Sequence, residues 1–118
     1  MSPPAKPASL KPMTDTQRGW LAGVLEGEGY FHSAKQGDRS YPRIAVTMCD
    51  LDVLVRLQEV TGVGTIDGPH KTRSDKHTPT YQWRVQRKND AIAVMRLVSP
   101  MMGTRRQARI EAVLSGIA

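Results

Sequence analysis

Polar and apolar residues alternate in two segments of the chain, and this period of two predicts β-strands. In residues 43–49, Ile, Val and Met alternate with Arg, Ala and Thr. In residues 81–87, aromatic and aliphatic side chains alternate with Gln and Arg. Segments of this kind have one apolar and one polar face. This is typical of an antiparallel sheet that packs one face against the core and leaves the other face in solvent.

A period close to 3.6 predicts helices elsewhere in the chain. Leucines and a valine recur at helical spacing through residues 51–61. Asp50 precedes this segment as a predicted N-cap, and Gly62 follows it as a stop signal. Asn89 is likewise predicted to cap a helix that runs to about Val98.

The remaining segments complete an order of helix, two strands, helix, two strands and two helices. Thr14 and Gln17 have the spacing of a capping box, which predicts a helix over residues 15–28. Three further elements are expected: strands over residues 30–36 and 63–67, and a last helix that begins at Ser99 and Pro100. The pattern therefore predicts an α+β protein.

Length and charge narrow the picture. The chain has 118 residues, enough for one domain. Residues 1–13 hold four of the eight prolines and predict a disordered arm, which leaves 14–118 as the folded domain. Lys and Arg number 17 against 11 Asp and Glu, a net charge of +6. A basic domain favours a polyanionic partner, although the charge is equally compatible with simple solubility.

Several classes of protein are disfavoured. A single cysteine, Cys49, closes no intrachain disulfide and makes no cysteine-rich zinc site, so an intracellular, reducing compartment is expected. No segment has the length of a membrane span or the form of a secretory signal. We therefore expect neither secretion nor a membrane partner.

Glycines recur at every fourth position of the N-terminal helix, at Gly19, Gly23 and Gly27. Together they cost about 3 kcal/mol of helix propensity relative to alanine. A second backbone packed against this glycine face would offset that cost, because glycine permits close approach. Glu26 and Glu28 lie where the helix dipole disfavours acids. The pattern indicates two helices side by side, with acids at one end that collect a metal ion.

This segment resembles the signature helix of the LAGLIDADG homing endonucleases. The family motif maps onto residues 21–29, Leu-Ala-Gly-Val-Leu-Glu-Gly-Glu-Gly. Two glutamates replace the motif's aspartates, and Gly27 replaces its alanine. The resemblance extends more loosely from Thr14 to Leu114. It implies the LAGLIDADG fold, αββαββα, in which an antiparallel four-stranded saddle sheet carries its helices on one face.

The resemblance also implies an activity. The chain holds one copy of the motif, and single-motif members of the family work as homodimers. The implied function is site-specific cleavage of double-stranded DNA with Mg²⁺ or another divalent cation, linked to intron or intein mobility in a cytoplasmic, phage or organelle DNA compartment. Two alternatives stay open: a weak or inactive nucleic-acid binder on the same fold, such as a maturase or regulator, and a structural domain with incidental charge.

Site residues follow from the same resemblance. Glu28 is expected to ligate metal and to be catalytic, with the Gly27 carbonyl as a further ligand. Arg105 is expected to stabilise phosphoryl charge. Two positions depart from the family, because Met48 and Thr104 replace a polar residue and a lysine, and slow turnover is therefore expected. The dimer interface is expected to comprise Gly19, Ala22, Gly23, Glu26 and Gly27.

The polar face of the sheet is the expected DNA reader. Arg and Gln side chains have the donor geometry to recognise base edges in the major groove. Any half-buried antiparallel sheet also has a polar outer face, so the argument depends on the fold. The expected DNA-binding residues are His32, Arg43, Thr47, Lys71, Arg73, Gln82, Arg84, Gln86 and Arg106.

Overall fold

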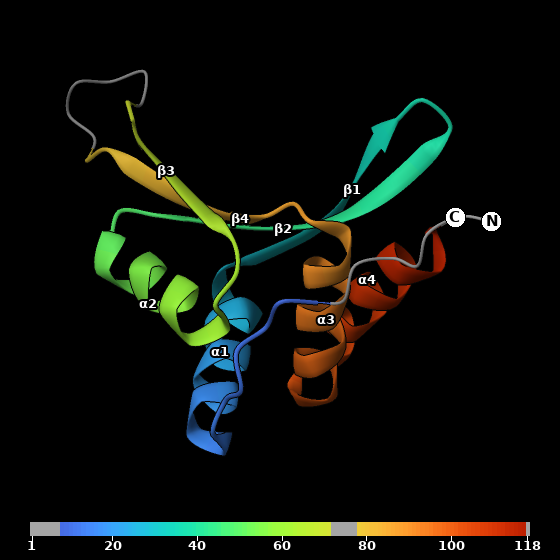
Figure 1. Cartoon of the computed structure of the whole chain (residues 1–118), viewed down its shortest axis with the longest axis horizontal. Helices are drawn as coiled ribbons and strands as arrows, with labels where there is room; N and C mark the ends of the chain where they lie inside the picture. The colour runs from blue at the N-terminus through green and yellow to red at the C-terminus, as the bar shows by residue number, and fades with distance from the viewer. Residues whose placement is uncertain (1–7, 72–77, 118) are drawn as a thin grey trace.

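Four antiparallel strands form one sheet, and the helices pack beneath it on one face (Figure 1). The computed structural model describes residues 8–71 and 78–117. The strand order is β1-β2-β4-β3, so the two hairpins meet where β2 pairs with β4. The elements are α1 Asp15–Glu28, β1 Gly29–Gln36, β2 Arg39–Met48, α2 Leu51–Thr61, β3 Thr65–His70, β4 Thr80–Val85, α3 Lys88–Val98, the 3₁₀ turn η1 Ser99–Met101 and α4 Thr104–Ser115.

The apolar face of the sheet and the apolar stripes of the helices share one core. Trp83 on β4 is completely buried, and its indole Nε1 donates a hydrogen bond to the Val63 carbonyl at 3.0 Å. Phe31 on β1 and Leu25 on α1 are also buried. Because the sheet uses one face for this core, its other face stays open and bends into the concave upper surface of Figure 1.

The predicted order of elements and the α+β class are confirmed. Several boundaries were wrong. The helix α2 does begin after Asp50 as predicted, although Asp50 makes no side-chain capping hydrogen bond, whereas α3 begins at Lys88 instead of after Asn89. Ser99 opens a 3₁₀ turn instead of the last helix, and α4 begins after an extended Gly103.

The N-terminal segment lies along the domain over the part that is described. The backbone N–H of Ser9 donates to the Asp90 carboxylate at 2.8 Å, and that of Lys11 donates to the Thr61 carbonyl at 2.9 Å. Residues 1–7 of the predicted arm lie outside the described residues, as does Arg73. Within the described ranges, no helix is long and apolar enough to cross a bilayer.

Candidate nucleic-acid interface

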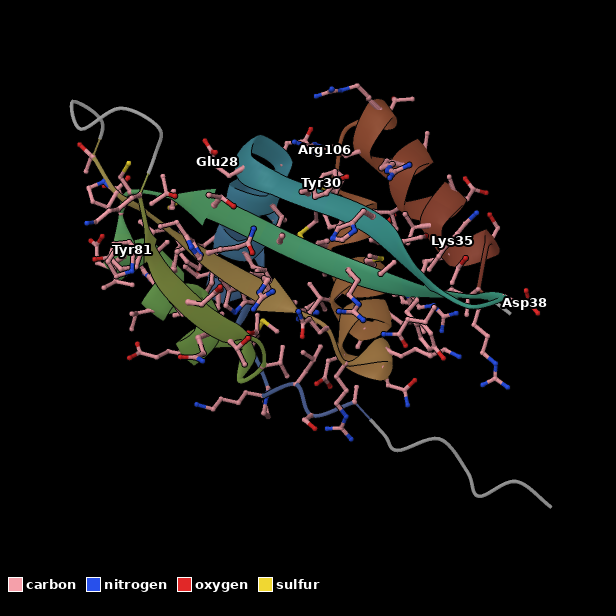
Figure 2. The ribbon with its side chains drawn as sticks, turned by 90° about the horizontal axis from the view of Figure 1, so that it is seen from above. Glu28, Tyr30, Lys35, Asp38, Tyr81 and Arg106 are labelled. Atoms are coloured by element: carbon pink, nitrogen blue, oxygen red, sulfur yellow. The ribbon has the colours of Figure 1, made fainter. Side chains whose placement is uncertain are left out.

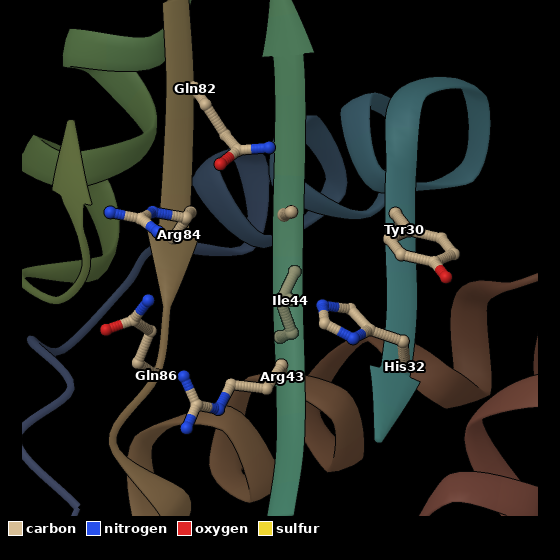
Figure 3. A pocket seen from close by; sticks show the side chains of 8 residues that line it. Tyr30, His32, Arg43, Ile44, Gln82, Arg84 and Gln86 are labelled. Atoms are coloured by element: carbon tan, nitrogen blue, oxygen red, sulfur yellow. The ribbon is translucent and has the colours of Figure 1, made fainter. Parts of the chain in front are cut away.

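A basic hollow lies on the open face of the sheet, across β1, β2 and β4 (Figure 3). Its volume is about 290 Å³. Five of the side chains that the sequence predicted to bind DNA line it together: His32, Arg43, Gln82, Arg84 and Gln86. Tyr30, Ile44 and Ala45 complete the lining.

Strand register explains why these side chains meet. His32 lies opposite Arg43, and Ala45 lies opposite Arg84, so all four positions share the open face. Thr47 lies opposite Gln82, and its hydroxyl oxygen accepts a hydrogen bond from the Gln82 amide at 3.0 Å. The period of two in the sequence therefore becomes one continuous polar surface.

Some polar atoms on this surface have no hydrogen-bond partner among the described residues. The Nε atoms of Arg43 and Arg84 are buried without a hydrogen-bond partner, and so is Oδ1 of Asp67. Arg84 Nε lies 3.4 Å from Asp67 Oδ1, close enough for an ion pair but without hydrogen-bond geometry. Asp67 is a polar residue of this face that the sequence analysis missed. Its place on the edge strand β3, beside Arg84, was visible only once the strands were paired.

An aromatic stack forms one wall of the hollow. The rings of Tyr30 and His32 lie parallel, with centroids 4.6 Å apart and planes 15° apart. Tyr30 is 58% exposed despite this stack, so much of its surface remains open to solvent. Burial lowers the pKa of His32 below its ordinary value of 6.5, and the charges of Arg43 and Arg109 lower it further. His32 is therefore a neutral ring at pH 7.

Glu28 ends α1 as an exposed acid, and Figure 2 shows it close to Tyr30 at the start of β1. Among the described residues, no group of three or more His, Cys, Asp or Glu side chains could hold a metal ion. The candidate donors that remain from the sequence analysis are the exposed Glu28 carboxylate and the carbonyl of the preceding Gly27. That donor set fits Mg²⁺, which takes one or two carboxylates and keeps several waters, when a second copy adds its own acid.

The glycine face of α1 is open. A Cβ atom built on Gly19, Gly23 or Gly27 meets no atom of the described residues within 4 Å, apart from the backbone of its own helix. Intrachain packing therefore does not account for these glycines. Ala22, which the sequence analysis grouped with them, is instead 5% exposed and belongs to the protomer's own core.

Hydrogen bonds join the C-terminal end of α1 to the N-terminal end of α4. A carboxylate oxygen of Glu26 accepts a hydrogen bond from the Gly103 N–H at 3.2 Å, which caps α4 of the same chain. Arg106 donates in return, from Nε to the Glu26 carbonyl at 3.0 Å and from Nη1 to the Gly29 carbonyl at 2.6 Å. These two carbonyls belong to residues on either side of Glu28 in the sequence. The hydrogen bonds from Arg106 therefore hold the backbone around Glu28 in place.

The neighbouring residues Arg105 and Arg106 therefore have different surroundings. Arg106 is half-buried and directed into its own chain, although the sequence predicted a DNA contact for it. Arg105 is exposed at the start of α4, and it makes no hydrogen bond or ion pair with residues 8–71 or 78–117. Lys71, just after β3, is exposed as well.

Replacing Arg106 with Met is expected to destabilise the protein by about 1–3 kcal/mol. The change leaves helix-end carbonyls without their charged donor, and hydrogen bonds to charged groups fall in this range. Urea unfolding of the variant measures the loss. The matched control is Arg105→Met, which removes the same charge one residue earlier and should change stability by less than about 0.5 kcal/mol. Equal losses in the two variants would contradict the cap.

No protein-family model and no curated protein matches the sequence. Solved structures do match the fold. The archaeal intron-encoded homing endonuclease I-Vdi141I, solved with DNA, is 21% identical over 86% of this chain, with a TM-score of 0.61. I-CvuI with its target in the presence of Ca is 18% identical over 85% of the chain, with a TM-score of 0.64. The group I intron-encoded I-CeuI, also with DNA, is 21% identical over 89%, with a TM-score of 0.64.

The chain has the homing-endonuclease fold. The fold predicted from the sequence is thereby confirmed, including its single four-stranded sheet with helices on one face. The chain spans 71% of the length of I-Vdi141I, 64% of I-CvuI and 55% of I-CeuI. In this fold, the basic hollow lies on the open face of the sheet, and Glu28 ends α1 directly before β1, the strand that carries Tyr30 and His32 of the hollow.

Proposed function

We propose that this chain is a homodimeric, site-specific endonuclease that cleaves double-stranded DNA with a divalent cation. One observation carries the proposal. The exposed acid Glu28 ends a helix whose glycine face is open. The strand that follows belongs to a concave, basic sheet face on which arginine Nε groups have no hydrogen-bond partner among the described residues. The neighbours of known structure include homing endonucleases complexed with DNA, which agrees with this function.

Each part of the proposal has a physical role. The glycine faces of two copies of α1 pack together and bring two Glu28 carboxylates to the centre of the dimer. The two concave sheet faces then form one long basic surface, as a duplex requires. Glu28 and the carbonyl of Gly27 would hold the cation. When bound, the cation activates water and stabilises the leaving oxygen of the cut phosphodiester.

The chain's own residues complete the site around that cation. Arg105 is exposed near Glu28's end of α1 and would stabilise negative charge on the phosphoryl group. Arg106 keeps the backbone around Glu28 in place through the two carbonyls it binds. Met48 and Thr104 offer neither a water-binding amide nor a cation, so we expect slow turnover beside ordinary binding.

The test is a cleavage selection. Purified protein is incubated with a randomised duplex library and Mg²⁺, and both the bound duplexes and the cut ends are sequenced. Cut ends at one enriched sequence support the endonuclease. Enrichment by binding with no cut ends at any Mg²⁺ concentration supports the non-catalytic binder. Absence of salt-dependent duplex binding overturns both.

DNA affinity is expected to rise as the pH falls below 6.5, through His32. In the free protein the pKa of His32 is lowered by burial, Arg43 and Arg109, while DNA phosphates close to the ring would raise it in the complex. Protonation therefore accompanies binding, and affinity increases by no more than about tenfold per pH unit for one proton. At a pH well above the pKa of His32 in the complex, the ring is neutral in both states, and affinity should be flat.

Fluorescence anisotropy at fixed ionic strength, from pH 8 to pH 5, measures this dependence. The control is His32→Gln, which keeps hydrogen-bonding groups but has no titrating ring, and which should flatten the curve. An equally steep rise in the variant would assign the proton to another group.

A further inference from the structure

We propose that Arg84 reads a guanine in the major groove and that Asp67 is the positioning residue that holds it for this task. The inference rests on the proposed function, since it names the base that the DNA-binding face selects. It concerns one pair of side chains on adjacent strands, Arg84 on β4 and Asp67 on β3. Neither side chain belongs to the hydrophobic core.

The geometry presents one end of the guanidinium outward. Arg84 Nε lies 3.4 Å from Asp67 Oδ1, an ion-pair distance without hydrogen-bond geometry, so the carboxylate lies beside the Nε edge of the group. The register places Arg84 between Ala45 on β2 and Thr65 on β3, and both neighbours have small side chains. Arg84 lines the hollow, and Figure 3 shows its guanidinium directed away from β2, on the side of β4 where β3 lies.

Asp67 is itself placed by a second contact. Its Oδ2 lies 3.2 Å from Nε2 of His70 at the end of β3, while its Oδ1 faces Arg84. The carboxylate therefore bridges two side chains and keeps one orientation. An arginine with a fixed carboxylate behind it loses less side-chain freedom when it binds, which favours a single docking geometry.

An acid on a DNA-binding face needs a reason, because phosphates repel it. Asp67 is 38% exposed at the side chain and belongs to the same polar surface as Arg43 and Gln82. Its charge makes the Arg84 site less attractive to an anionic phosphate and leaves a neutral base edge as the better partner. The negative charge of Asp67 thus favours a base contact by Arg84 over a contact with a DNA phosphate, because it repels the phosphate.

Guanine is the base that fits. A guanidinium fork is a double donor, and guanine alone presents two adjacent acceptors, N7 and O6, in the major groove. Adenine offers one acceptor beside a donor, and thymine offers one acceptor beside a methyl group. Such a bidentate pair discriminates against the wrong base by roughly 5- to 150-fold.

The experiment is a binding selection from a randomised duplex library without divalent cation, so that cleavage plays no part. Four proteins are compared: wild type, Arg84→Ala, Asp67→Ala and the double variant. The wild type should enrich one guanine per half-site. Arg84→Ala should lose that preference by the factor above, and Asp67→Ala should lose part of it. The double variant should match Arg84→Ala, because Asp67 acts through the arginine.

Two further variants keep the result interpretable. Arg84→Lys keeps the positive charge without the fork, so it should retain overall affinity and salt dependence but lose the guanine preference. Thr65→Ala, directly opposite Arg84 on the same strand as Asp67, is the matched control and should leave the preference intact. Circular dichroism checks that every variant is folded.

The outcomes separate the two proposals. Salt-dependent binding without a guanine preference, or a preference that survives in Arg84→Ala, overturns the inference alone. An even loss of affinity for all sequences in Arg84→Ala also overturns it, since that is the behaviour of a phosphate contact. A base preference that depends on Asp67 in the Arg84→Ala background overturns the positioning role. No duplex binding by the wild type overturns the proposed function together with the inference.

Discussion

Replacing Glu28 with Gln is expected to reduce DNA cleavage by on the order of 10³-fold or more, with DNA affinity unchanged. The substitution keeps the size of the side chain but removes the charge of the exposed carboxylate that ends α1, directly before β1. Loss of a single electrostatic group at a phosphoryl centre typically costs 10²–10³ in rate, and a dimer loses two such groups at once. Single-turnover cleavage of the selected duplex, beside anisotropy without metal, gives both numbers.

Glu26→Gln is the matched control, because it makes the same change two residues earlier on the same helix. Glu26 accepts a hydrogen bond from the Gly103 N–H and places a negative charge at the N-terminal end of α4. The glutamine amide oxygen can still accept that bond, so loss of the charge should lower stability by about 0.3–1 kcal/mol. Cleavage at a temperature well below unfolding should persist. Full activity in Glu28→Gln would remove this acid from the catalytic centre, and equal loss in both variants would assign the effect to the helix end as a whole.

Replacing Gly23 with Leu is expected to weaken dimerisation by on the order of 100-fold or more. A leucine in a close helix–helix contact overpacks it, at about 1–3 kcal/mol for each copy. Within one chain the substitution is harmless, because a Cβ on Gly23 meets no atom within 4 Å. The helix even gains about 1 kcal/mol of propensity. Analytical ultracentrifugation across a concentration series, with and without DNA, measures the dissociation constant.

The open glycine face makes this test sharper than the sequence alone allows. Unfolding of the variant is not expected, so loss of the dimer reports on the interface. Ala112→Leu, on an exposed position of α4, is the control and should leave the oligomeric state unchanged. A wild-type protein that stays monomeric at micromolar concentration, both alone and on DNA, would refute the homodimer.

Local signals in the sequence were sufficient for most of the elements. The capping box at Thr14 and Gln17 is present, with both hydrogen bonds formed, and α1 covers the predicted residues. Asp50 precedes α2 as predicted but makes no side-chain capping hydrogen bond, and Asn89 lies inside α3 instead of before it. Residue preference alone does not fix the exact end of a helix or the side-chain geometry that a cap requires. Ser99 and Pro100 signal a helical turn correctly, yet only a short 3₁₀ turn fits there before α4.

The sequence by itself determined which side chains share a face. Period-two alternation in β2 and β4 assigns Arg43, Gln82 and Arg84 to the polar side of a sheet, and glycine spacing gives α1 one smooth face. Both conclusions depend only on local geometry, which repeats along a strand or a helix. The nature of the partner for that smooth face stayed open at this level.

Only the tertiary structure decided which of these groups meet across distant segments. It paired Asp67 with Arg84, turned Arg106 from an expected DNA contact into a cap on α1, and placed Ala22 in the core. Glu26 likewise caps α4 of its own chain. Contacts between residues far apart in sequence follow from how strands pair and helices pack. No local pattern encodes that relation, because it is the minimum of interactions summed over the whole chain.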